Sequence, residues 1–126
     1  MSKASISDVR TIAVAVTDQD RAVAFYRDVL GFEVRMDGAF GEGRWIEVAP
    51  AGAATTIALA LAGQGIPATA SDTGIRLSTP DAAATHAALL GAGADADAEV
   101  LELGDYVPPM FSVRDPDGNS LVVVQA

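Results

Sequence analysis

The sequence predicts an α+β domain in which two βαβββ modules form curved mixed sheets around a cup, with the helices on the outer face. Three observations support this prediction. Alternating apolar residues mark most of the strands, each of two helical patterns follows a strand, and the order of elements begins again near residue 73. The 126 residues, half of them apolar, suit one hydrophobic core, so residues 1–126 are expected to form a single domain.

The first module is expected to cover about residues 6–62. Alternation over Val9–Val16 predicts its first strand. Thr17 or Asp18 can then cap a helix that Gly31 ends, because apolar residues recur between them at helical spacing. Those residues are Ala22, Phe25, Tyr26, Val29 and Leu30.

Three further strands complete the first module, and they are predicted over residues 32–37, 44–49 and 56–61. Segments that contain glycine or proline separate them, as is typical of turns. Alternation along the first of these strands predicts that one of its faces carries Phe32, Val34 and Met36.

The second module is expected to cover about residues 73–126, after a Gly-, Pro- and Ser-rich linker at about 63–72. Its first strand runs through Ile75 and Leu77, and its helix is opened by Pro80 and Asp81. Asp81 and Gly93 lie 63 and 62 positions after Asp18 and Gly31, so the repeat is one of pattern. Three more strands are predicted over residues 99–103, 110–114 and 120–124.

Alternation divides the strand residues into two faces. One face carries branched apolar side chains that are expected to pack beneath the helices. The other is mostly small or polar, and small side chains on a concave sheet leave volume unfilled. We therefore expect the second face to be a ligand cavity or a partner surface. This second face is called the floor of the cup. A shift of one residue in the strand register would exchange the two faces, so either Ile46 or Glu47 lies on the floor.

The composition excludes several kinds of partner and chemistry. The net charge of −9 and the absence of a basic cluster argue against nucleic acid or an anionic membrane as partners. Without cysteine, neither disulfides nor thiolate chemistry is possible. The N-terminal residues lack the apolar run of a signal peptide, and no stretch approaches about 18 apolar residues, which predicts a cytoplasmic protein.

Trp45, Glu47 and Arg76 are the large side chains expected on the floor. Glu47 is either a satisfied or solvated carboxylate, or a base whose pKa burial perturbs. An ion pair between Glu47 and Arg76 would account for both residues without a ligand. If that pair is not made, Arg76 is a natural anchor for a carboxylate or phenolate.

Aromatic and thioether side chains form a second candidate group. Phe40, Trp45, Tyr106 and Met110 can line a pocket for a flat apolar ligand, although core packing or a dimer seam would explain them equally well. His86 is the only histidine, and it has no companion ligand nearby. A structural role in the second helix is therefore favoured for His86.

Specific motifs occur at three places in the chain. They are Ala15-Val16-Thr17-Asp18 with Arg21-Ala22, then Phe25-Tyr26-Arg27-Asp28-Val29-Leu30-Gly31-Phe32, and finally Asp115-Pro116-Asp117-Gly118-Asn119. Together they resemble the vicinal oxygen chelate superfamily, the group of glyoxalases, bleomycin-resistance proteins and extradiol dioxygenases. The resemblance covers essentially the whole chain and implies the fold described above, while saying little about chemistry.

In metal-dependent members of this superfamily, four His or Glu ligands lie on the floor, two from each module. The resemblance places these positions at Thr11, Glu47 (or Ile46), Gly74 and Val122. Three of them cannot serve as normal ligands, and one carboxylate does not hold a divalent ion against water. We therefore expect no metal and no cofactor.

Three functions remain open. The first, which the resemblance to drug-sequestering resistance proteins favours, is metal-independent binding of a small aromatic or natural-product ligand, in a homodimer whose pockets both chains complete. The second is a metal-free isomerase or lyase in which Glu47 is the base and Arg76 holds an anionic group. The third is a metal-dependent enzyme with atypical ligands. The expected ligand-binding residues are Thr11, Phe40, Trp45, Glu47, Arg76, Tyr106 and Met110.

Overall fold

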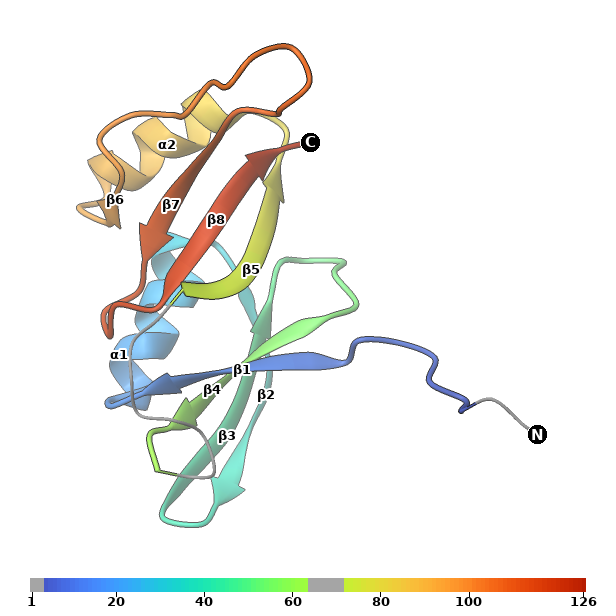
Figure 1. The fold of residues 1–126 in the computed structure, drawn as a ribbon. Helices are drawn as coiled ribbons and strands as arrows, with labels where there is room; N and C mark the ends of the chain where they lie inside the picture. Colours follow the sequence, from blue (N-terminus) through green and yellow to red (C-terminus); the bar gives the residue numbers. More distant parts are fainter. Residues whose placement is uncertain (1–3, 64–71) are drawn as a thin grey trace.

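The computed structural model describes residues 4–63 and 72–126 (Figure 1). The first module consists of β1 (Thr11–Val16), α1 (Gln19–Ala24), η1 (Phe25–Val29), β2 (Glu33–Phe40), β3 (Gly43–Ala49) and β4 (Thr56–Leu61). The second consists of β5 (Asp72–Thr79), α2 (Ala82–Gly91), β6 (Asp95–Ala96), β7 (Met110–Arg114) and β8 (Ser120–Gln125). Most of the predicted linker, residues 64–71, lies outside the described residues.

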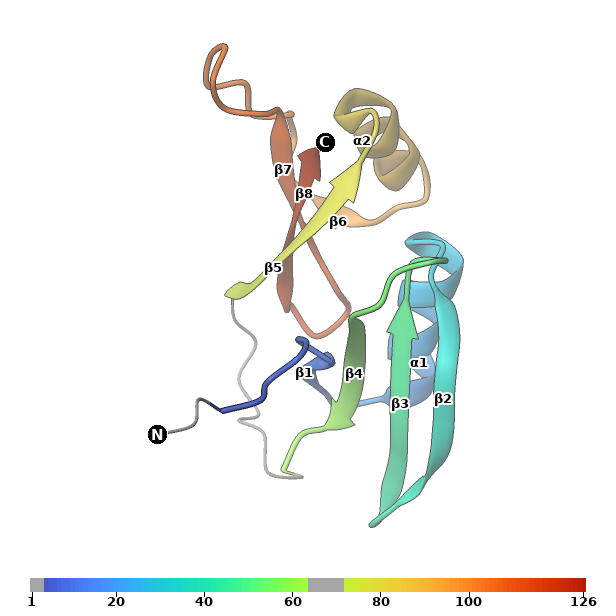
Figure 2. The ribbon, with the colours of Figure 1, turned by 90° about the vertical axis from the view of Figure 1, so that its right-hand side faces the viewer.

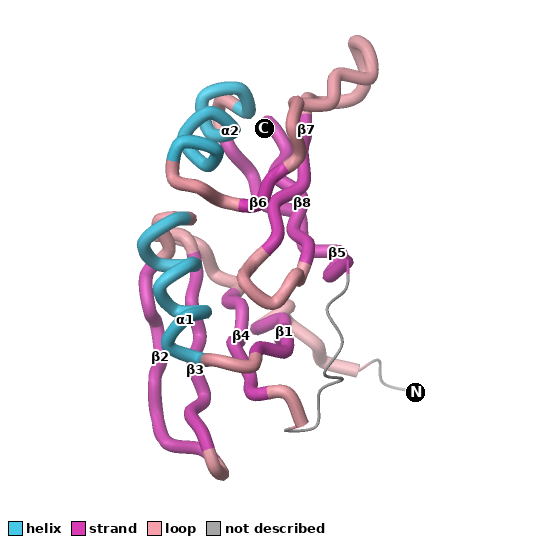
Figure 3. Tube along the Cα trace, turned by 90° about the vertical axis from the view of Figure 1, so that its left-hand side faces the viewer, coloured by secondary structure: helices cyan, strands magenta, loops and turns pink. Residues whose placement is uncertain are grey.

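Each module forms its own four-stranded mixed sheet. The strand orders are β1-β4-β3-β2 and β5-β8-β7-β6, so the first strand of each module is an outermost strand. In both sheets the first and last strands pair in parallel and the other neighbours pair antiparallel. Both helices lie on the same side in Figure 1, and Figure 3 shows each beside the sheet of its own module. This arrangement confirms the predicted α+β fold of two βαβββ modules.

Both helices begin at the predicted caps. The side chain of Asp18 accepts a hydrogen bond from the backbone N–H of Arg21, and Asp81 does the same for Ala84, each at 3.0 Å. The first helix then widens into the π-helical turn η1, where the N–H of Leu30 donates to the carbonyl of Phe25 at 3.1 Å. Gly31 follows with a φ of 77°, the left-handed conformation that ends many helices.

One predicted face of the second strand is wrong because β2 contains a bulge. Val34 pairs with Val48, whereas Met36 pairs with Glu47, so the register shifts between them. Val34 and Met36 therefore point to opposite faces of the sheet. Arg35 occupies the bulge, and its guanidinium donates to Glu33 and to the backbone carbonyls of the 50–53 turn.

The strand predicted over residues 99–103 is also wrong. In the described residues this segment contributes only an isolated bridge between Leu101 and Met110, and the two-residue β6 pairs with β7 instead. A strand is stabilised when the side chains of one of its faces are buried. Leu101 and Leu103, which share a face, are 50% and 57% exposed. Asp95, the first residue of β6, and Asp97, directly after it, form ion pairs with Arg114 at 3.1 and 3.2 Å.

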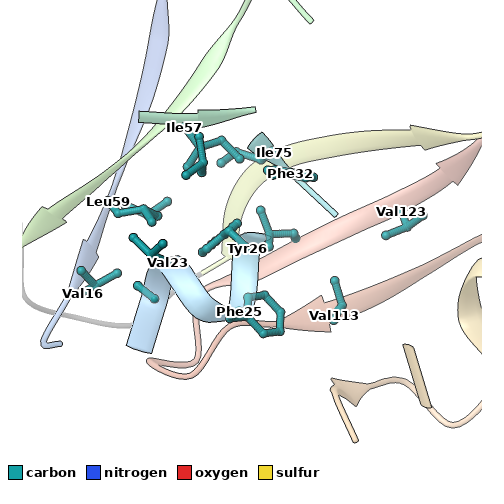
Figure 4. Packing of buried hydrophobic residues seen from close by; sticks show 14 of the residues in the cluster. Val16, Val23, Phe25, Tyr26, Phe32, Ile57, Leu59, Ile75, Val113 and Val123 are labelled. Atoms are coloured by element: carbon teal, nitrogen blue, oxygen red, sulfur yellow. The ribbon is translucent and has the colours of Figure 1, made fainter. Parts of the chain in front are cut away.

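The branched residues pack into a buried cluster to which both modules contribute. Figure 4 shows Phe25 from the first module beside Val113 from the second. The predicted core face is largely confirmed, because Val14, Val16, Ile46, Val48, Ile57, Leu59, Ile75, Phe111, Val113, Leu121 and Val123 are all buried. Burial of this apolar area is the main favourable contribution to folding.

The turn between β7 and β8 connects the second module to the first through hydrogen bonds. Asp115 Oδ2 accepts hydrogen bonds from the Tyr26 hydroxyl and the Asn119 side chain, each at 2.9 Å. Its Oδ1 accepts from the backbone N–H groups of Asp117 and Asn119, also at 2.9 Å. Asn119 additionally donates to the carbonyl of Ala15 at 2.8 Å. This motif therefore has a structural role, because it satisfies buried polar groups from both modules.

Candidate functional site

The side of each sheet that the helices do not cover is referred to below as its free face (Figure 2). On β3 the register assigns Glu47 to this face, where it pairs with Met36 and Ala58. Ile46 is fully buried in the core. The structure therefore resolves the open choice between Ile46 and Glu47 in favour of Glu47.

Glu47 is only 6% exposed, and each of its carboxylate oxygens accepts a hydrogen bond. The indole N–H of Trp45 donates to Oε2 at 2.8 Å, and the hydroxyl of Thr56 donates to Oε1 at 2.7 Å. The Thr56 hydroxyl also lies 2.8 Å from that of Thr11, which donates to the Thr56 carbonyl at 3.1 Å. These contacts join β1, β3 and β4 in one polar network.

The network stabilises the ionised carboxylate. The hydrogen bonds from Trp45 and Thr56 lower the pKa of Glu47 below its ordinary value, although burial acts in the opposite direction. The charge of Arg10 lowers this pKa further. At neutral pH the group is a fixed negative charge and hydrogen-bond acceptor, and it is a weaker base than a free glutamate.

Trp45 lies among small residues of the first sheet. Gly38 is its cross-strand neighbour on β2, and Phe40 contacts the indole edge to face, with ring centroids 5.9 Å apart. On β4 the nearest residues of the same face are the fully buried Ala58 and Ala60. The hydrogen bond to Glu47 fixes the orientation of the half-buried indole.

The second sheet carries Arg76 and Met110 on its free face. Arg76 lies beside Val122, which lies beside Ser112, and Met110 occupies the next row with Val124 and Ser78. The Arg76 side chain is exposed, and it makes no hydrogen bond or ion pair with any other described residue. The ion pair with Glu47 that the sequence suggested is therefore not formed within the described part of the chain.

The structure thus separates the predicted ligand-binding residues. Thr11, Glu47, Trp45 and Phe40 are linked on the first sheet, while Arg76 and Met110 lie on the second. Tyr106 is fully exposed in the loop before β7. Sequence reasoning did not single out Thr56, although its place on the alternating strand 56–61 gave the correct face.

His86 packs in the second module. Its Nε2 lies 2.7 Å from the carbonyl of Asp97, and its ring meets Phe111 edge to face with centroids 4.9 Å apart. The residue is 9% exposed. These contacts account for the only histidine by packing, as the sequence favoured.

The described residues form three surface pockets away from Trp45 and Glu47. One of about 550 Å³ lies between the turn at 50–53 and β5, and its lining includes Thr56 and Arg76. A second of about 350 Å³ lies between the modules beside α2, and a third of about 480 Å³ lies beside the start of α1. Trp45 and Glu47 line none of these three.

The four positions suggested for metal ligands do not suit a divalent ion. They hold one carboxylate at Glu47, one hydroxyl at Thr11, and no donor side chain at Gly74 or Val122. Among residues 4–63 and 72–126 no three side chains of His, Cys, Asp or Glu are grouped to hold an ion. The same part of the chain contains no helix that is long and apolar enough to cross a membrane.

Comparison with known proteins agrees with this fold. The family described as "Glyoxalase/Bleomycin resistance protein/Dioxygenase superfamily" matches residues 9–123. A curated relative, YetH from Bacillus subtilis (strain 168), is 40% identical over 55 residues. That match spans 43% of this chain and 46% of YetH, less than half of either protein.

Solved structures match over nearly the whole chain. TnmS3, an antibiotic binding protein from Streptomyces sp. CB03234, is 30% identical, with 98% of each chain covered and a TM-score of 0.82. A superfamily member from Sphaerobacter thermophilus DSM 20745 is 31% identical, with 96% of this chain and 98% of that one covered and a TM-score of 0.85. UcmS2 is 26% identical, with 94% and 98% covered and a TM-score of 0.79.

Proposed function

Because the chain belongs to the glyoxalase/bleomycin resistance protein/dioxygenase superfamily, we propose that it binds and sequesters a small aromatic molecule on the free face of its first sheet. The likeness to an antibiotic binding protein supports a binding role. No catalytic residue is needed for sequestration.

The observation that carries this proposal is the orientation of Trp45 by Glu47. A buried carboxylate holds the indole N–H at 2.8 Å, and Gly38 and two alanines are its neighbours in the sheet. A half-buried indole held in one orientation is a rigid aromatic surface, and such a surface binds a flat ring at a low entropic cost. The same arrangement does not favour Glu47 as a catalytic base, because both oxygens accept hydrogen bonds and its pKa is lowered.

We further propose that a second copy of the chain completes the pocket. Trp45 and Glu47 do not line any of the three pockets described above, and two other predicted ligand residues, Arg76 and Met110, lie on the second sheet. The outermost strands β1 and β5 each present an edge that no described strand covers, and such edges readily pair with another chain. Pairing between β1 of one copy and β5 of its partner would place the free face of the first sheet of one copy next to the free face of the partner's second sheet.

A thermal-shift screen against aromatic natural products tests the binding function. We expect at least one compound to raise the Tm of the wild-type protein, and Trp45→Ala to abolish that shift while the protein stays folded. Leu103→Ala serves as a control because Leu103 is exposed in the loop before β7. A panel without any stabilising compound, or shifts that persist in Trp45→Ala, would contradict the proposal.

A further inference from the structure

Glu47 is the only ionisable residue on the free face of the first sheet that lacks a charged partner among the described residues. The register places Glu33 on the same face at the end of β2, but Arg35 pairs with it at 2.6 Å. The other residues of this face are uncharged, and they are Thr11, Ala13, Ala15, Met36, Gly38, Phe40, Gly43, Trp45, Ala49, Thr56, Ala58 and Ala60. Among the described residues, this face therefore carries one negative charge that has no ion-pair partner.

The two donors to Glu47 do not supply the missing positive charge. The indole of Trp45 and the hydroxyl of Thr56 are neutral, and no ion pair in the described residues includes Glu47. Arg10 acts on it only from a distance beyond an ion pair. A carboxylate has about four acceptor sites, so the two hydrogen bonds leave capacity for another donor. These hydrogen bonds already favour the ionised carboxylate, and an opposite charge on a ligand would stabilise it further.

The aromatic surroundings favour the same kind of partner. A cation above a tryptophan or phenylalanine ring is attracted by the negative face of the ring. Trp45 donates a hydrogen bond to the carboxylate, and Phe40 packs against Trp45 with the ring centroids 5.9 Å apart. The net charge of −9 also raises the concentration of cations near the protein.

From these observations we propose that the ligand carries a protonated amine, which pairs with Glu47 while the attached aromatic group packs against Trp45. This inference rests on the proposed function, because it names the chemical class of molecule for the same site. The amine would form the direct ion pair with Glu47 that no residue in the described part of the chain forms.

Three naphthalene probes of matched size test the inference by calorimetry. They are 1-naphthylmethylammonium, the neutral 1-naphthalenemethanol and the anionic 1-naphthoate. We expect wild-type protein to bind the ammonium probe at least about tenfold more tightly than the alcohol, since hydrogen bonds to charged groups are worth about that much. Naphthoate is expected to bind most weakly, and added salt should reduce the preference for the ammonium probe.

Two variants locate the charge that causes the preference. Glu47→Gln should bind the ammonium probe and the alcohol within about twofold of each other. Glu102→Gln removes the same charge from an exposed position in the second module and should keep the preference. The wild-type comparison of the three probes remains decisive if Glu47→Gln does not fold.

Each remaining outcome identifies which proposal fails. Equal wild-type affinity for the ammonium probe and the alcohol, with Trp45 required for both, would overturn the amine inference and leave aromatic binding intact. A preference that survives in folded Glu47→Gln would also overturn the amine inference. No detectable binding of the ammonium probe at millimolar concentration would overturn it as well, whereas Trp45-independent binding would count against the proposed function itself.

Discussion

At the scale of single residues, the response of Glu47 to acid follows from its hydrogen bonds. The pKa of Glu47 in the folded chain is lowered from its ordinary value in the unfolded chain, mainly by the hydrogen bonds from Trp45 and Thr56. The ionised group therefore stabilises the fold above that ordinary value, and its contribution is lost as the pH falls through the lowered pKa.

Glu47→Gln should consequently change the pH dependence of stability. Between pH 7 and about pH 3, the wild-type free energy of unfolding should fall more than that of Glu47→Gln. Urea unfolding at several pH values measures the free energy of unfolding of the wild type and of Glu47→Gln. Parallel pH profiles would show that the hydrogen bonds from Trp45 and Thr56 do not favour the charged form.

Tyr26 provides a second test at this scale, because its hydroxyl joins the modules. The ring is fully buried, and burial together with the neighbouring Asp115 raises the pKa of Tyr26. Tyr26→Phe removes one hydrogen bond to a carboxylate and should lower the free energy of unfolding by about 1.5–3 kcal/mol. Tyr106→Phe is the matched control, because Tyr106 is fully exposed and should show no change in urea unfolding. Equal stability of Tyr26→Phe and wild type would contradict this role.

At the scale of elements, the structure follows the sequence closely where a local signal is strong. Asp18 and Asp81 cap their helices, and Gly31 follows the first helix with a positive φ, as their positions predicted. The bulge at Arg35 could not be read from alternation, because its cause is a set of contacts with the distant turn at 50–53. In residues 99–103 only Val100 packs against the core, and Leu101 and Leu103 are half exposed, so the segment does not form a strand.

Two glycine substitutions test the end of the first helix. An added methyl group would meet nothing within 4 Å at either Gly31 or Gly91, so backbone conformation alone decides the effect. Gly31→Ala should destabilise the protein by about 1–2 kcal/mol, since φ is 77° there. Gly91→Ala, in the last turn of α2, should be neutral or stabilise by up to about 1 kcal/mol. Urea unfolding distinguishes the two, and a stable Gly31→Ala variant would contradict the assignment of the helix end.

At the scale of the whole molecule, the separation of Trp45 from Arg76 shows what the sequence could and could not predict about the site. Alternation placed most of the candidate residues on the correct faces, because a strand has a fixed period of two. It could not show that β1 and β5 each keep one edge that no other described strand covers, since this depends on how the modules pack.

The proposed dimer gives a direct expectation for the mass in solution. Sedimentation at micromolar concentration should yield about twice the chain mass of 12.8 kDa. A stable monomer at all concentrations would contradict completion of the pocket by a second copy.

The chain contains a single tryptophan, so one indole N–H resonance in a ¹⁵N-correlated NMR spectrum reports on the ligand site directly. Addition of an aromatic compound from the stabilising set should shift this resonance, because its hydrogen bond to Glu47 lies beside the bound ring. Backbone resonances of Ala13, Gly38 and Ala58 should shift with it. An unchanged indole resonance, with shifts confined to the pocket beside α2, would place the ligand elsewhere and contradict a binding site on the first sheet.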